Sequence, residues 1–199
     1  MLSFARIGFH APGLGTWHGY SLPFLDESAG QRAATLGGLA LVSGVLSDLT
    51  YGWVAEPYPV LPGIYFGLVL VVGLAFWATH SPLKLAIAFA ASNLAWWGAF
   101  QAALFLYPYA EDLTSVPAIL CGAASGVIGA LVTAAAAAYA CPGFATRENW
   151  IRTLVAGGLA GVLLQGIDIG AGTQLPLLLV WQAAVAASIG YGLVNSERQ

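Results

Sequence analysis

Long apolar runs alternate along the chain with short segments that contain prolines, glycines and charges. The run over residues 85–107 has no charged side chain. A helix needs about 20 apolar residues to cross a hydrocarbon core about 30 Å thick, so this run predicts a transmembrane helix. Applied to the whole chain, the same criterion predicts an all-α integral membrane protein. Its six predicted transmembrane helices cover residues 33–54, 62–79, 85–107, 116–141, 150–169 and 175–194.

Residues around the predicted helix ends agree with this division. Asp26, Glu27 and Ser28 precede the first helix, and each can accept a hydrogen bond from a free amide of its first turn. Pro62 is suited to the first turn of the second helix, where its missing N–H costs nothing. These residues indicate that the apolar runs begin and end as helices.

The first 32 residues differ from the rest of the chain. Prolines and glycines interrupt them, and no apolar core followed by a cleavage site indicates a secretory signal. We therefore interpret residues 1–32 as an interfacial N-terminal segment and residues 33–199 as one six-helix transmembrane domain. Four apolar side chains could anchor a short amphipathic helix at the lipid headgroups: Leu2, Phe4, Ile7 and Phe9.

The charged residues between the predicted helices indicate the orientation in the membrane. Lys and Arg are enriched in cytoplasmic loops. All six basic residues fall on one side: Arg6, Arg32, Lys84, Arg147, Arg152 and Arg198. The opposite loops hold acidic residues without any Lys or Arg: Glu56, Glu111, Asp112 and Asp168. Both termini are therefore predicted to be cytoplasmic.

Composition supports a membrane location and argues against nucleic acid as a partner. Only 8% of the residues are charged and 59% are hydrophobic, whereas about 25% are charged in an ordinary soluble domain. The net charge of −3 offers no basic surface for phosphates. Compact loops with Ala- and Gly-rich, Lys-poor usage favour a bacterial inner membrane.

Polar side chains gather in the outer halves of the predicted helices. Carboxylates and amides inside a membrane usually face a bundle interior or a wet cavity, so they are candidates for a functional site. We expect an outward-facing pocket that binds a small molecule. Its predicted substrate-binding residues are Asp48, Tyr51, Trp97, Gln101, Gln165, Asp168 and Gln182. Two alternatives stay open: the carboxylates are hydrated near the interface, and the amides join helices.

The aromatic residues within the spans raise the same question. Asn93, Trp97 and Gln101 follow each other at i, i+4 and i+8, so they share one flank of the third helix, which we expect to face protein. Indole N–H groups inside the membrane need an internal partner or a ligand. This requirement applies to Trp96, Trp97 and Trp181.

Pairs of small residues predict where helices approach closely. Gly122 and Gly126 in the fourth helix, with Gly157 and Gly161 in the fifth, are expected to pack inside the protein. The small residues of the first helix can dock either within the chain or against a second membrane protein: Ala34, Gly38, Ala40 and Gly44.

Motifs for enzyme chemistry do not occur in the sequence. No HExxH, GxSxG or phosphate-binding Gly-Lys loop is found, and no histidine lies within a predicted span. We therefore expect no catalysis, metal or cofactor. Cys121 and Cys141 lie on one predicted helix about 30 Å apart, which is too far for a disulfide.

Two classes of function are compatible with this pattern. In size and predicted topology, the chain resembles the substrate-binding S-components of energy-coupling-factor vitamin transporters, and the resemblance implies a ligand bound from outside. It implies no particular vitamin. The alternative class is a structural or assembly subunit of a larger membrane complex, in which the polar residues serve helix contacts.

Overall fold

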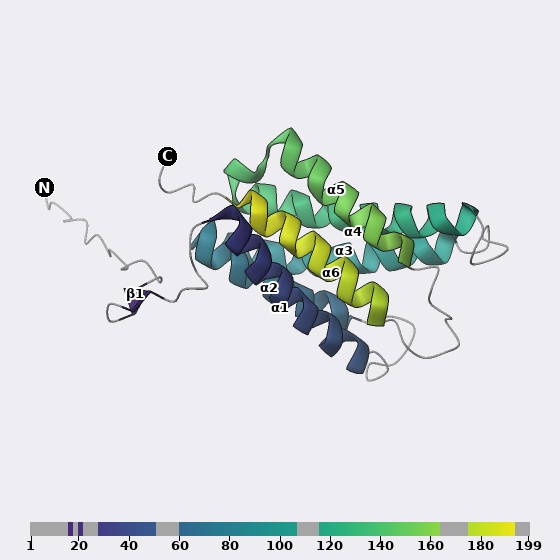
Figure 1. Cartoon of the computed structure of the whole chain (residues 1–199), viewed down its shortest axis with the longest axis horizontal. Helices are drawn as coiled ribbons and strands as arrows, with labels where there is room; N and C mark the ends of the chain where they lie inside the picture. Colours follow the sequence, from purple (N-terminus) through teal and green to yellow (C-terminus); the bar gives the residue numbers. More distant parts are fainter. Residues whose placement is uncertain are drawn as a thin grey trace, which may run out of the picture.

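The computed structural model describes residues 16–17, 20–21, 28–50, 60–106, 116–163 and 175–193 (Figure 1). Its α-helices are α1 (Ala29–Leu49), α2 (Leu61–Trp77), α3 (Pro82–Leu106), α4 (Val116–Ala140), α5 (Arg147–Gly161) and α6 (Leu175–Gly192). A 3₁₀ turn, η3 (Pro142–Phe144), precedes α5. Near the N-terminus, two-residue strands β1 (Thr16–Trp17) and β2 (Tyr20–Ser21) pair antiparallel.

Each predicted helix has its counterpart in the structure, and capping side chains set two of the starts. α1 begins at Ala29, earlier than the predicted residue 33, because Ser28 Oγ accepts a hydrogen bond from the Gln31 amide at 3.2 Å. α5 likewise begins before the predicted residue 150, because Thr146 Oγ accepts from the Asn149 amide at 3.3 Å. Both helices begin directly after the capping residue, and therefore a few residues before the first apolar residue of each predicted span.

Three of these helices, α3, α4 and α6, are long and apolar enough to cross a membrane. α2 is also an apolar helix, but it is only 17 residues long. These three helices indicate a membrane-embedded protein. The six-span count and the side on which the termini lie remain predictions. The predicted amphipathic helix at Leu2, Phe4, Ile7 and Phe9 lies outside the described residues.

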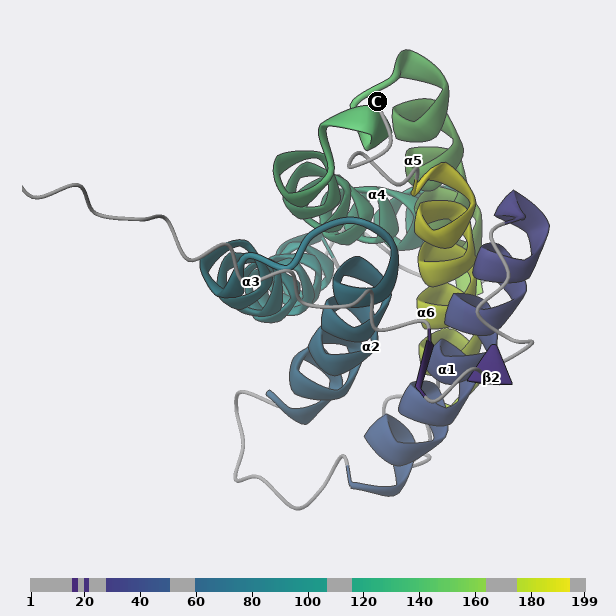
Figure 2. The same cartoon turned by 90° about the vertical axis from the view of Figure 1, so that its left-hand side faces the viewer.

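The helices form a ring in chain order. Each packs against the next along the chain, and α6 closes the ring by packing along α1. α6 also touches α2 and α4 across the interior. Figure 2 shows α3 and α1 on opposite sides of this bundle. The arrangement makes α6 the most central helix and leaves α3 at an edge.

Glycines bring two pairs of helices into backbone contact. A Cβ atom at Gly126 of α4 would overlap the carbonyl oxygen of Gly157 in α5, and one at Gly161 would overlap that of Gly122. The prediction that these four glycines pack inside the protein is confirmed. Between α1 and α6, a Cβ at Gly44 would lie 2.8 Å from the Cα atom of Leu179.

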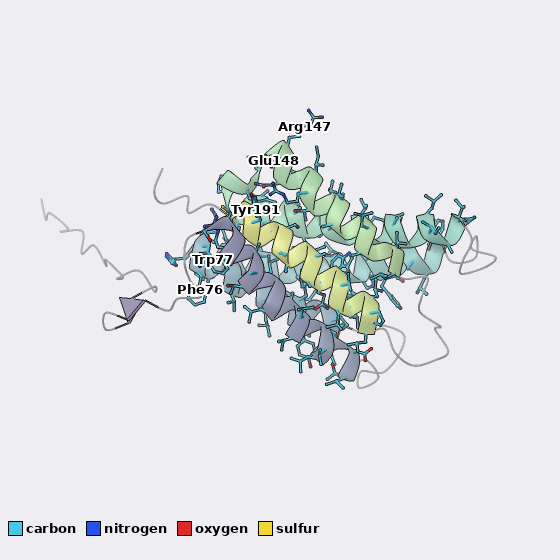
Figure 3. All side chains as sticks on the ribbon, in the orientation of Figure 1. Phe76, Trp77, Arg147, Glu148 and Tyr191 are labelled. Atoms are coloured by element: carbon cyan, nitrogen blue, oxygen red, sulfur yellow. The ribbon has the colours of Figure 1, made fainter. Side chains whose placement is uncertain are left out.

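The basic residues of the described part lie near helix ends that meet at one end of the bundle: Arg32, Lys84, Arg147 and Arg152. Figure 3 labels Arg147 and Tyr191 at this end. Arg32 Nε donates to the carbonyl of Gly190 at 3.3 Å, which ties the start of α1 to the end of α6. The Arg152 guanidinium lies 4.3 Å from the centre of the Tyr191 ring. Lys84 Nζ reaches the last carbonyl of α4 at 3.4 Å. The side of the membrane on which these residues lie stays a prediction.

A test of the α4/α5 contact compares two glycine substitutions. Gly126→Ala should lower the free energy of unfolding by about 1–3 kcal/mol, because the new methyl group forces the two backbones apart. Gly38→Ala in α1 is the matched control: no atom lies within 4 Å of the new methyl. That change should leave stability unchanged or raise it by up to about 1 kcal/mol. Unfolding in mixed detergent micelles measures both, and equal effects would refute backbone contact as the cause.

Candidate functional site

A chain of polar groups joins α1 and α6 inside the bundle. Gln182 of α6 is 1% exposed, and its Nε2 donates to Ser47 Oγ at 3.2 Å. Ser47 Oγ in turn donates to the carbonyl oxygen of Ser43, one turn earlier in α1, at 2.7 Å. Ser43 and Ser47 lie on one face of the helix because four residues make about one turn. This face meets α6.

Two atoms of this chain have no hydrogen-bond partner among the described residues. They are Gln182 Oε1 and Ser43 Oγ, and both are buried. Exchanging the oxygen and nitrogen of the Gln182 amide would not remove the deficit, because an N–H group would then be left without an acceptor. A buried polar atom without a partner costs about 1–3 kcal/mol. Gln182 thus has an unpartnered acceptor and Ser43 an unpartnered hydroxyl.

Close packing limits what can reach these atoms. The backbones of α1 and α6 touch at Gly44, between Ser43 and Ser47 in sequence. A Cβ at Gly37, two turns earlier, would lie 3.2 Å from the Ala187 Cβ. Both unpartnered atoms are therefore enclosed by the packed helices, and the touching backbones leave no room for a ring between them.

Asp48 is the second predicted site residue in this region. It lies in the last turn of α1, directly after Ser47, and is half-buried. The structure therefore places a carboxylate and the Gln182 amide at the same end of the α1/α6 pair. Three further predicted residues lie outside the described residues: Tyr51, Gln165 and Asp168.

The other two predicted residues, Trp97 and Gln101, belong to α3 at the opposite side of the bundle (Figure 2). α3 packs against α2 and α4, which separate it from α1. Ala99 is the residue of this turn that faces inward, towards Gly129 and Trp181. Trp97 is 48% exposed. The structure does not bring it together with the α1/α6 polar chain.

The expectation that the flank of Asn93, Trp97 and Gln101 faces protein holds only in part within this chain. Asn93 packs against Gly63 of α2 and donates from Nδ2 to the Phe89 carbonyl at 2.9 Å. Four residues later, the flank has turned to the outside of the bundle. The reason is that α3 contacts its neighbours through a narrow strip of small residues, Ala88, Ser92 and Ala95.

Trp181 shows how an indole is satisfied in the interior. Its Nε1 donates to the Gly126 carbonyl at 3.3 Å, and its ring lies 5.5 Å from that of Phe66, centre to centre. The predicted partner of its N–H is therefore internal, a backbone carbonyl of α4. Trp96 stacks on Phe100, with ring centres 6.4 Å apart. Trp181 thus fills the bundle centre.

Sequence reasoning missed Ser43 and Ser47. Each follows a small contact residue, Ala40 or Gly44, by three positions, and this spacing could have indicated them because residues three apart share a helix face. The four small residues of α1 fall into a buried pair and an exposed pair. Ala40 and Gly44 are buried, whereas Ala34 and Gly38 are exposed.

Comparisons with known proteins give no assignment for this site. No family model, no curated protein and no solved structure matches the chain. Within the described ranges, no three His, Cys, Asp or Glu side chains gather in a way that could hold a metal ion. Cys121 and Cys141 are both buried and form no disulfide with each other, as their predicted separation along one helix requires.

The polar chain makes a prediction about two substitutions. Ser47→Ala should lower the free energy of unfolding by about 1–3 kcal/mol, because it leaves the Gln182 amide without any partner. Gln182→Leu should change it by less than about 1 kcal/mol, since both polar ends of that side chain disappear together. The double variant should resemble Gln182→Leu alone. Denaturant titration in detergent measures all three, and a Gln182→Leu variant less stable than Ser47→Ala would contradict this account.

Proposed function

We propose that this protein is a structural or assembly subunit of a membrane protein complex. The observation that carries the proposal is the outward face of α3. In the stretch of α3 that could cross a membrane, only 17% is buried inside the bundle, compared with 50% in each of α4 and α6. This face carries Trp97 and Gln101, for which no hydrogen-bond partner exists in the described part of the chain.

The packed interior supports the same proposal. Glycine contacts close the α4/α5 and α1/α6 interfaces, and Trp181 fills the centre beside Phe66. A transport protein of the kind expected from sequence would need a hydrated cavity bounded by α1, α3, α5 and α6. α3 is separated from α1 in the ring, which makes such a cavity difficult to form from these helices.

Native mass spectrometry tests the proposal directly. The protein is released from its own membrane into gentle detergent or nanodiscs, and the mass of the intact assembly is measured. We expect bound protein subunits in fixed stoichiometry. A lone chain at every protein concentration, with or without a bound small molecule, would contradict the proposal.

A second candidate function is small-molecule binding or transport from outside, as in the S-components that the chain resembles in size and topology. The unpartnered Gln182 Oε1 and Ser43 Oγ, with Asp48 nearby, favour it. In this proposal, Asp48 attracts a cation or accepts hydrogen bonds, and Gln182 orients the ligand. The remaining residues proposed for the pocket are Tyr51, Trp97, Gln101, Gln165 and Asp168.

Both candidates share one proposed location. The chain would lie in a bacterial inner membrane, with both termini on the cytoplasmic side. The gathering of the described basic residues at one end of the bundle supports this orientation.

The Gln182→Leu variant separates the two candidates, because it is expected to keep its stability. If the protein binds a small molecule through the α1/α6 polar chain, wild type should purify with that molecule and the variant should lose it. Ala34→Leu, at an exposed position of α1 away from the polar chain, is the control that should retain it. Equal small-molecule content in wild type and Gln182→Leu would refute this binding mode.

A further inference from the structure

We draw no further inference here: the strongest candidate, the buried side-chain cluster of Ser43, Ser47 and Gln182 between α1 and α6, belongs to the candidate site already described, and no contact within the described residues shows what its two unpartnered atoms would bind.

Discussion

Backbone contact between helices is the constraint on which this bundle depends. Lipid tails are as apolar as leucine side chains, so helices in a membrane gain little from burying apolar surface against each other. Dispersion contacts over short distances take the place of the hydrophobic effect. Gly126 and Gly157 let α4 and α5 touch, and Gly44 does the same between α1 and α6. These two contacts fix α4 against α5 and α1 against α6.

Contact this close leaves little room for polar side chains, and most of them bond within their own helix. Ser125 Oγ donates to the Cys121 carbonyl at 2.9 Å, and Thr133 Oγ1 to the Gly129 carbonyl at 2.8 Å, each one turn back. Such bonds satisfy a hydroxyl without a partner helix. A glutamine cannot be satisfied so simply, because it has two donors and an acceptor. Gln182 therefore retains an unpartnered oxygen, and so does Ser43, whereas Ser125 and Thr133 are satisfied.

The sequence predicted the helices well because length and apolar content determine them. The pairing of Gly122 and Gly126 with Gly157 and Gly161 was also predictable, since small residues one turn apart mark a contact face. The face of α3 that packs against the bundle was not predictable from the sequence. In a membrane, lipid-facing and protein-facing residues are equally apolar, so hydropathy along α3 does not distinguish Trp97 from Ala99. The packing of α3 against α4 shows it, because Ala99 and Trp181 both lie close to Gly129.

A comparison of two tryptophans, Trp181 in the interior and Trp97 on α3, shows where polar groups are left unsatisfied. Trp181 has both a carbonyl for its N–H and an aromatic neighbour, so its polar group is satisfied within one chain. Within the described residues Trp97 has neither, and it lies one turn before Gln101 on the exposed side of α3. The unpartnered atoms at Ser43 and Gln182 lie between closely packed helices, where no second helix can reach them. Within the described residues, hydrogen bonding is thus incomplete both inside the bundle and on its outer face, and the proposed assembly function rests on the outer deficit.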